Sequence, residues 1–329
     1  MNQSNLLSVA IPTYKRPELL DKGIESIFNS AKASGIEVLV MDDSLGNGND
    51  WVYQKHLALG RNLRVIRNPV NLGIDANICA CIEHAASDYV WLFGEDDLMR
   101  LEAVDQALAA IERDAQAPFV FANYAYITAD HKKIFREKSV EIRAGQMEFK
   151  EFFENYLWSA GFIGGCIIRR SNFLATRYKE FIGTYYAHVA GICLASHNKN
   201  ITVIERPLVG NRVGDATTFT WSADSYGVFQ GWRDLLRMLQ SEFGADSFKR
   251  AFQSHIDAHG YLRLKFLLGK KADGLLTPAD VQILANGDTS PEEKQRIRFV
   301  AFCVPRFFCI ALRKTYASAR RMNLPDFQL

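Results

Sequence analysis

The sequence lacks a long hydrophobic run, because no stretch of about 20 consecutive apolar residues occurs in its 329 residues. We therefore expect no segment that spans a membrane. The first residues, MNQSNLLSVAIPTYKRP, contain no charged segment followed by a long apolar stretch, so we expect no signal peptide. These absences predict a cytoplasmic protein, with attachment to the inner face of the cell membrane left open.

Cysteine is scarce and shows no spacing typical of metal or redox sites. None of the six cysteines forms a Cys-x-x-Cys pair or a zinc-cluster pattern. Most lie among apolar neighbours, as small core residues do in a reducing compartment. Internal repeats and low-complexity segments are missing too. With 48% apolar and 23% charged residues, the composition excludes a disordered chain, a collagen-like fibre and a disulfide-stapled miniprotein.

The whole chain also has little net charge, because 39 Lys and Arg residues against 37 Asp and Glu residues give a formal charge of +2. We expect no nucleic-acid partner. The charge is uneven, however, because residues 294–329 carry +7 and the first 293 residues −5. Aromatic and basic residues interleave in this tail, so we expect residues 294–322 to form an amphipathic helix on an anionic membrane surface. Packing of that helix on the rest of the protein is the alternative.

Strands and helices alternate along the first part of the chain. Apolar runs predict buried strands, and the segments between them have helical spacing. This pattern predicts an α/β fold with a mostly parallel central sheet flanked by helices. We place one domain at residues 1–218 and a helical C-terminal region with the basic tail at 219–329. The predicted strands are 6–11, 36–41, 63–67, 89–93, 119–127 and 201–209, with a strand-like run within 161–170. A helix is predicted at 185–196, and the predicted C-terminal helices are 223–243, 247–268, 278–285 and 291–321.

Three carboxylates, Glu95, Asp96 and Asp97, directly follow the predicted strand 89–93. Adjacent carboxylates repel one another unless a cation lies nearby. A divalent ion completed by a nucleotide diphosphate would satisfy them, whereas capping of the next helix is the alternative. The predicted strand 36–41 also ends in acids, Asp42 and Asp43, which taken alone indicate an ordinary Asx turn.

Four segments in order resemble the family 2 glycosyltransferases with the GT-A fold. They are LSVAIPTYKRP at 7–17, VLVMDDS at 38–44, NLGIDAN at 71–77 and YVWLFGEDD at 89–97. The resemblance covers about residues 5–215. A further segment, GTYYAHVAG at 183–191, is similar to O-antigen transferases of the abequosyltransferase type.

The resemblance implies a Rossmann-like GT-A sheet and an enzyme that uses a nucleotide-sugar donor. It also implies a divalent metal, Mn²⁺ or Mg²⁺. The acceptor would be a glycan or a lipid-linked oligosaccharide carried on a polyprenyl diphosphate. The process would be the synthesis of a surface polysaccharide or O-antigen, by a single displacement that inverts the anomeric carbon.

The resemblance also assigns residues. In this family's terms the first loop would line the nucleotide pocket, Asp42 would bind the base, and the 71–77 segment would form the floor beside the ribose. Glu95 stands where the family usually has the first Asp of D-x-D, Asp97 is the expected metal ligand, and Asp215 could add another. The expected nucleotide-binding residues are Pro12, Thr13, Tyr14, Arg16, Asp42, Asn71, Gly73, Asn77, Glu95, Asp96 and Arg212.

The catalytic base is missing in its usual form. The family places an Asp at the start of a late helix, but the matching residues 183–191 contain no carboxylate. His188 is nearest to that position, and a neutral imidazole is a competent base near pH 7. A packing or sugar-binding role is the alternative for His188. Glu180 and Asp215 are the nearest acids.

Other classes fit less well. A phosphatase of the haloacid-dehalogenase type needs Asp-x-Asp after its first strand, which is absent. A dinucleotide-binding oxidoreductase needs Gly-x-Gly-x-x-Gly there, and residues 12–17 contain no glycine. A degenerate protein of the same fold that binds nucleotide sugar or glycan without turnover remains the alternative, since the usual base is lacking.

Overall fold

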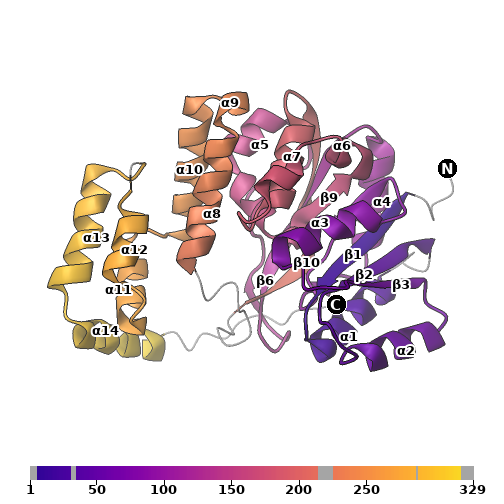
Figure 1. Cartoon of the computed structure of the whole chain (residues 1–329), viewed down its shortest axis with the longest axis horizontal. Helices are drawn as coiled ribbons and strands as arrows, with labels where there is room; N and C mark the ends of the chain where they lie inside the picture. Colours follow the sequence, from indigo (N-terminus) through magenta and orange to yellow (C-terminus); the bar gives the residue numbers. More distant parts are fainter. Residues whose placement is uncertain (1–5, 31–34, 214–224, 287, 320–329) are drawn as a thin grey trace.

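Ten strands form one mixed sheet at the centre of the protein (Figure 1). The computed structural model describes residues 6–30, 35–213, 225–286 and 288–319. The strands are β1 (Leu7–Thr13), β2 (Glu37–Asp42), β3 (Leu63–Arg67), β4 (Tyr89–Leu92), β5 (Leu98–Met99), β6 (Phe119–Thr128), β7 (Ile134–Arg136), β8 (Gly145–Glu148), β9 (Cys166–Arg169) and β10 (Asn200–Val213). The predicted α/β fold with a central sheet is confirmed.

The order along the sheet is β3-β2-β1-β4-β9-β6-β10-β5, with β7 beside β6 and β8 beside β10. The half formed by β3, β2, β1 and β4 is parallel, as is the β6–β10 pair. Strand β9 runs antiparallel between β4 and β6, and β5, β7 and β8 are also antiparallel to their partners. The sheet is therefore more mixed than the alternating pattern predicts.

The parallel half explains the apolar runs and aligns the strand ends. Almost every residue of β1, β2 and β4 is buried, which is typical of strands covered on both faces. In the register, Thr13 lies opposite Asp42 and Ala10 opposite Leu92. The polar residues that follow β1, β2 and β4 therefore meet at one edge of the sheet, as predicted.

Helices cover the sheet. Helix α3 packs against β1, β2 and β4, and α4 packs against β6 and β10. The sequence patterns did not predict β5, β7 and β8, or α5, α6 and the 3₁₀ turns between β8 and α7. The helices before the C-terminal region are α1 (Pro17–Asn29), α2 (Asp50–Ala58), α3 (Ile74–His84), α4 (Ala103–Arg113), α5 (Phe149–Asn155), α6 (Arg170–Leu174) and α7 (Ala187–Ser196), with 3₁₀ turns η3 (Leu157–Gly161), η4 (Ile163–Gly165) and η5 (Tyr178–Phe181).

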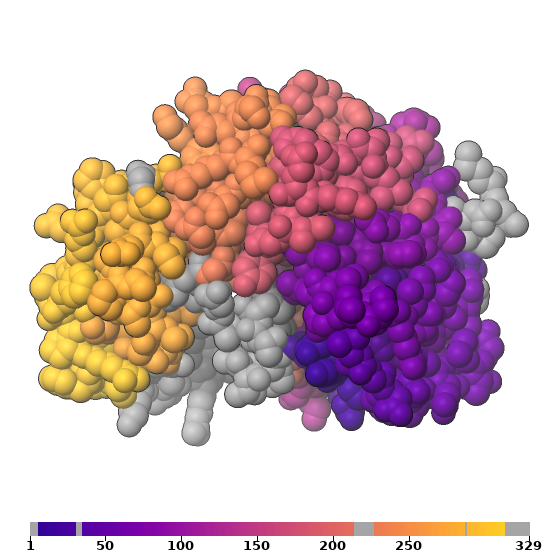
Figure 2. Space-filling view, viewed as in Figure 1, coloured from indigo at the N-terminus to yellow at the C-terminus, as the bar shows by residue number. Residues whose placement is uncertain are grey.

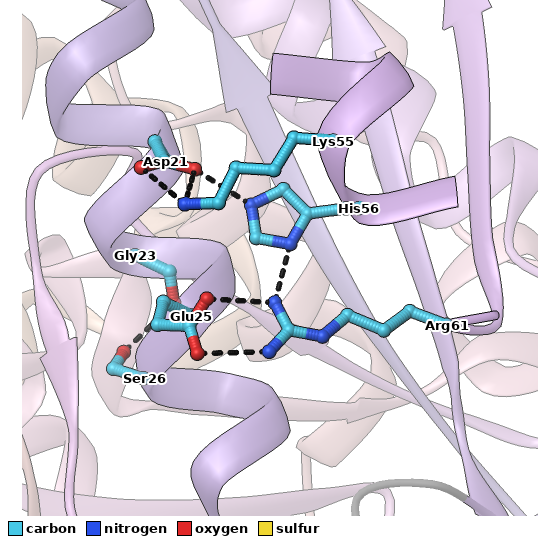
Figure 3. A network of polar contacts seen from close by, with 7 residues as sticks. All are labelled: Asp21, Gly23, Glu25, Ser26, Lys55, His56 and Arg61. Carbon is cyan, nitrogen blue, oxygen red and sulfur yellow. Dashed lines mark hydrogen bonds and ion pairs between the residues drawn. The ribbon is translucent and has the colours of Figure 1, made fainter. Parts of the chain in front are cut away.

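A charged network joins α1 to α2 (Figure 3). Lys55 Nζ lies 2.8 Å from both oxygens of Asp21, and His56 Nε2 lies 2.9 Å from one of them. Arg61 binds Glu25 through two contacts of 2.8 and 2.9 Å and also contacts His56 Nδ1. Burial lowers the pKa of His56. Bidentate pairs fix the orientation of the groups they join, so this network holds α1 against α2. The first turn of α1 begins beside the acidic residues that follow β4.

Within residues 225–286 and 288–319, the C-terminal region contains seven helices. They are α8 (Ser225–Met238), α9 (Gln240–Phe243), α10 (Ala245–His259), α11 (Leu264–Asp273), α12 (Pro278–Leu284), α13 (Pro291–Cys303) and α14 (Arg306–Ala319). Two predicted long helices are wrong. The helix over 247–268 is interrupted at Gly260, whose φ of 65° gives a left-handed cap, and the helix over 291–321 is interrupted at Pro305. The predicted boundary at residues 218 and 219 lies outside the described residues.

The helical region packs tightly on the sheet region. Helix α10 contacts α5 and η3. On α8, a Cβ built at Gly231 would lie 2.0 Å from the carbonyl oxygen of Thr184, whereas one built at Gly269 on α11 would meet nothing within 4 Å. Helix α8 therefore lies directly against the backbone just before α7, and glycine at 231 permits that approach.

Gly231→Ala should lower the free energy of unfolding by about 1–3 kcal/mol, because a methyl group there overpacks a backbone contact. Gly269→Ala is the matched control, and it should leave stability unchanged or raise it by up to about 1 kcal/mol. Thermal and urea unfolding of the two variants measure both effects. Equal stability of the two variants would contradict the close packing of α8.

Candidate active site

The acidic loop (residues 95–97) follows β4 and lies against the loop that joins β1 to α1. Glu95 Oε2 accepts hydrogen bonds from the Thr13 hydroxyl at 2.5 Å and from the Tyr14 backbone N–H at 2.9 Å. Pro12 is half-buried in β1, and the Tyr14 ring is 40% exposed, with Lys15 Nζ 4.9 Å from its centre. The structure therefore brings the first loop and the acidic loop together, as predicted for a donor pocket.

Two arginines reach the acidic loop from distant parts of the chain. Arg16 Nε lies 3.6 Å from Glu95 Oε1, and its Nη1 lies 3.7 Å from Asp96 Oδ2. Arg212 places Nη1 3.4 Å from the same Asp96 oxygen, and its Nε donates to the carbonyl of Ala129 at 2.8 Å. Guanidinium groups bind phosphate in the same planar manner as carboxylate. Both guanidinium groups therefore lie at the acidic loop, where Arg16 is partly exposed and Arg212 is buried and bonded to Ala129.

Asp97 is the innermost member of the acidic loop, with only 3% of its surface exposed. Its Oδ1 accepts a hydrogen bond from the Arg212 backbone N–H at 3.0 Å. A Cβ at Gly94 would lie 2.2 Å from its Oδ2, so this conformation needs glycine at 94. Burial, together with the neighbouring Asp96 charge, raises the pKa of Asp97 well above its usual range.

The other two carboxyl groups are also disfavoured in their charged form. Burial raises the pKa of Glu95 to about 7. Burial also raises the pKa of Asp96, and the positive charges of Arg16 and Arg212 partly offset this rise. A divalent cation would relieve this, and carboxylate oxygens are the ligands that Mg²⁺ and Mn²⁺ prefer.

Within the described parts of the chain, no three His, Cys, Asp or Glu side chains are arranged to hold a metal ion. The acidic loop fits a metal whose remaining ligands come from a nucleotide diphosphate and water.

The end of β2 differs from the prediction. Asp42 is 2% exposed, and its two oxygens accept hydrogen bonds from Ser44 N–H at 3.0 Å and from the Tyr53 hydroxyl at 2.7 Å. This arrangement is the Asx turn that was the alternative, and it gives no support to contact with a nucleotide base. The base-binding role expected of Asp42 stays a prediction, and in this conformation both of its oxygens are engaged within the protein.

Asp43 holds the 71–73 loop in its place. Its oxygens accept hydrogen bonds from the backbone N–H groups of Leu72 and Gly73 at 2.8 and 3.0 Å, and Asn71 Oδ1 accepts a second bond from Gly73. Residues 71–73 are exposed, and Gly73 has φ 77°, a value that favours glycine. The loop can therefore serve as the exposed floor that the resemblance implies.

Asn77 is buried beneath this loop. Its side chain donates to the carbonyl of Met41 at 3.1 Å and accepts from Asn68 at 2.9 Å. Direct contact with a ribose is not supported, and Asn77 acts as a brace between β2 and the segment after β3.

Asp75 is a residue that the sequence analysis missed. It lies in the first turn of α3, and its carboxylate accepts hydrogen bonds from the backbone N–H groups of Gly183, Tyr185 and Ala187 at 2.9, 2.8 and 2.9 Å. Residues 183–187, which we call the entry loop, lead into α7. Gly183 and Tyr185 have φ values of 103° and 69°. One buried carboxylate therefore fixes a loop with two left-handed residues, at the position where the family carries its base.

His188 does not reach the surface. Its side chain is in the first turn of α7 and the residue is 1% exposed. Nε2 lies 3.2 Å from the carbonyl of Ala160, and Nδ1 is buried without a hydrogen-bond partner. Burial lowers the pKa of His188 to about 4. A base must lie within hydrogen-bond reach of the proton it removes, so the predicted catalytic role of His188 has no geometric support in this conformation.

A second missed residue is His131, in the turn between β6 and β7. Its Nε2 lies 2.9 Å from the backbone carbonyl of Asp96, and burial lowers its pKa. His131 has φ 63°, and the sequence Ala-Asp-His after β6 contains residues that tolerate such turns. That composition is the signal that could have revealed the hairpin. Asp215, the other expected ligand, lies outside the described residues.

Residues 8–176 match the sequence profile of glycosyl transferase family 2. The matched segment is just over half of the chain, and it contains β1, the 71–77 segment and the acidic loop. The chain belongs to glycosyl transferase family 2. It is a glycosyltransferase, and its α7 and Arg212 lie beyond the part that the family profile matches.

Two relatives resemble this family 2 glycosyltransferase along most of its length. Abequosyltransferase RfbV of Salmonella typhimurium is 28% identical over 272 residues, which cover 76% of this chain and 79% of that protein. The GalNAc(5)-diNAcBac-PP-undecaprenol beta-1,3-glucosyltransferase of Campylobacter jejuni is 24% identical over 244 residues, which cover 72% and 74%. The similarity to an abequosyltransferase agrees with the resemblance of residues 183–191.

Solved structures confirm the GT-A-like fold. Residues 1–349 of S. aureus TarS, in complex with UDP, align with 97% of this chain and 93% of that one at a TM-score of 0.59 and 13% identity. The chain spans 55% of the longer TarS structure. The mannosyltransferase PcManGT from Pyrobaculum calidifontis, in complex with GDP-Man and Mn²⁺, aligns with 98% of this chain and 83% of that one, at a TM-score of 0.54 and 14% identity.

Asp75→Asn should destabilise the protein by about 1–3 kcal/mol, because an amide group replaces one acceptor and leaves a buried backbone N–H without a partner. Asp257→Asn, on the exposed side of α10, is the matched control and should have little effect. Urea unfolding measures the difference. If Asp75→Asn unfolds at the same denaturant concentration as the control, the carboxylate does not fix the entry loop.

His188 should make stability depend on pH. The unfolded chain binds this proton near pH 6.5, whereas the folded protein binds it only near pH 4. The contribution of the neutral imidazole is therefore complete above about pH 6.5, and up to about 3 kcal/mol is lost as the pH falls to about 4. His188→Gln should lose stability less steeply across this interval in urea unfolding, whereas His84→Gln, at an exposed histidine, should follow the wild-type profile.

Proposed function

We propose that this glycosyltransferase transfers a hexosyl or deoxyhexosyl group from a nucleotide-diphosphate donor to a lipid-linked glycan during the synthesis of a surface polysaccharide or O-antigen. The observation that carries the proposal is the acidic loop between Arg16 and Arg212 at the carboxyl ends of the strands. Ligands bind at this edge in open α/β sheets. The name of the Campylobacter relative supplies the acceptor class, an undecaprenol-linked glycan, and the name of the Salmonella relative supplies the kind of group transferred, an abequosyl group.

The acidic loop would hold a divalent metal, Mn²⁺ or Mg²⁺, through Asp97, with Asp96 beside it. When bound, the metal would neutralise charge on the leaving nucleotide diphosphate. The donor chemistry of the loop and the Mn²⁺ complex of PcManGT support this assignment. Glu95 is engaged with Thr13 and Tyr14, so it would orient the first loop instead of binding metal.

The chain's own cations would share the phosphate charge. Arg16 and Arg212 each contact Asp96, and a diphosphate that arrives there can accept hydrogen bonds from both guanidinium groups. Because these groups are already positioned by Glu95 and by the Ala129 carbonyl, they would stabilise developing charge without large rearrangement. A single in-line displacement at the anomeric carbon would invert its configuration.

We assign Asp75 and His188 to positioning rather than to proton transfer. Both side chains are buried: Asp75 holds the entry loop, and His188 joins the first turn of α7 to the carbonyl of Ala160 in η3. The entry loop lies where family members carry the base, so its shape would set how an acceptor approaches. The absence of a carboxylate within residues 183–191 keeps a nucleotide-sugar-binding protein without turnover as the second candidate.

Nucleotide binding tests the donor site. With UDP, GDP, CDP and dTDP, each with and without Mn²⁺, we expect one nucleotide to raise the melting temperature in a metal-dependent way. A ligand at 100 times its Kd stabilises the native state by about 2.7 kcal/mol. Asp97→Asn should lose the metal-dependent part of the shift, whereas Glu112→Gln, on the exposed face of α4, should keep it.

Asp97→Asn keeps an oxygen that can accept from Arg212 N–H and removes a buried like charge, so a lost shift does not report unfolding. The absence of a shift with every nucleotide would contradict the donor site. A shift without sugar transfer or donor hydrolysis would favour the binding protein without turnover.

A further inference from the structure

The outer side of α13 and α14 is an unusually apolar surface for the edge of a protein. We define the α13–α14 face by six exposed side chains, of which Phe307 is 74% and Phe302 63% exposed. An apolar patch on this scale marks an interaction site more often than chance packing. The six are Phe299, Phe302, Phe307, Phe308, Ile310 and Leu312.

The α13–α14 face is not needed for the packing of its own helices. The buried residues described in this pair, Ile297, Val300, Ala301 and Cys309, point to the inner side. Arg306 Nε donates to the carbonyl of Ala272 at 3.1 Å, which fixes the start of α14 at the end of α11. The aromatic side chains are therefore held outward by a rigid support. In Figure 2 these helices form the yellow lobe at one end of the molecule.

The break at Pro305 gives this face two parts that meet at an angle. A groove of about 500 Å³ runs along α13 and is open to solvent. Among the described residues that line it, aromatic rings are combined with cationic side chains and no acid occurs: Pro291, Lys294, Gln295, Arg298, Phe299, Phe302 and Cys303. Aromatic and cationic groups on one surface are the combination found where helices lie in the headgroup region of a bilayer.

Several cationic side chains lie around the face, and one exposed acid, Asp273, lies at the end of α11 beside Ala272. Lys294 and Arg298 lie on α13, Arg306 begins α14, and the adjacent helix α11 adds exposed Lys265. The acids of α13, Glu292 and Glu293, are confined to its first turn, where Glu293 forms a capping box with Ser290. No helix in the described parts of the chain is long and apolar enough to cross a membrane. A helix pair of this kind suits the surface of a bilayer, not its interior.

We propose that the α13–α14 face docks on the surface of a phospholipid bilayer that carries anionic headgroups. Phe302 and Phe307 enter the headgroup region, and Lys294, Arg298 and Lys265 contact lipid phosphates. This inference rests in part on the proposed function, since a lipid-linked acceptor lies in such a bilayer. The positive charge of the face favours a lipid bilayer over a second copy of the chain as its partner. In a two-fold symmetric dimer the same cations of the two copies would lie close together and repel one another.

Vesicle flotation with the full chain tests the proposal. We expect the protein to float with vesicles of phosphatidylcholine and phosphatidylglycerol at a two-to-one ratio and to bind vesicles of phosphatidylcholine alone at least about tenfold more weakly. Raising the ionic strength to about 0.5 M should release much of the bound protein. Equal binding to both vesicles, or binding to neither, would overturn the proposal.

A pair of matched variants locates the contact. Phe302→Ser with Phe307→Ser should lower the partition into anionic vesicles by about tenfold or more, since two buried rings are lost from the interface. Leu57→Ser with Leu59→Ser removes two side chains that are 51% and 59% exposed on and beside α2, and it should not change partition. An equal loss in both double variants would contradict a specific docking face.

The result of the vesicle test is independent of the result of the nucleotide-binding test. The flotation uses no nucleotide, and the nucleotide shift uses no lipid. A protein that shows the metal-dependent shift but does not float would keep the donor site and lose the docking face. If light scattering finds a dimer that the phenylalanine double variant dissociates, and vesicles do not bind, the face is an interface between copies and the proposal is wrong.

Discussion

The burial of three successive carboxylates at the end of β4 is the constraint on which the rest of the site depends. Like charges in a poorly solvated place are unfavourable, and the raised pKa of Glu95 and Asp97 shows that the protein offsets only part of this effect. The fold has to bring cations to the same point from distant segments. Parallel pairing of β1 with β4 places Arg16 there, and the pairing of β10 with β5 places Arg212 beside Asp97.

Buried carboxylates have a second use in this protein, as acceptors for the backbone of loops. Asp43 follows β2, and Asp75 lies in the first turn of α3. The first holds residues 72 and 73, and the second holds the entry loop. Each loop contains at least one residue with positive φ, which would otherwise be costly to keep in one conformation. The loop before α3 and the loop before α7 are therefore each fixed by a buried carboxylate from another segment of the chain.

The sequence predicts those parts of the fold in which the same pattern occurs in several segments. Long apolar strands that end in polar residues identified the parallel half and the acidic loop. Strands β5, β7 and β8 are two to four residues long, too short for a period to show. Asp42 and Asp43 are adjacent at a strand end, where neighbouring side chains point to opposite sides, so composition could not tell which one serves the loop.

For His188 a signal was present. Helix α7 is apolar on all sides, and such a helix is buried all round.

The hydrogen bonds of Asp75 also constrain how this enzyme can be recombined with its relatives. Asp75 lies inside the segment that the family profile matches, whereas the entry loop that it holds lies outside. A hybrid joined near residue 176 would combine the carboxylate of one parent with the loop of another, and likewise Asp97 with a foreign Arg212. A junction after Val213 keeps both pairs within one parent. The contacts of Asp75 and of Asp97 therefore tie the residues that the family profile matches to the segment that follows them, up to Val213.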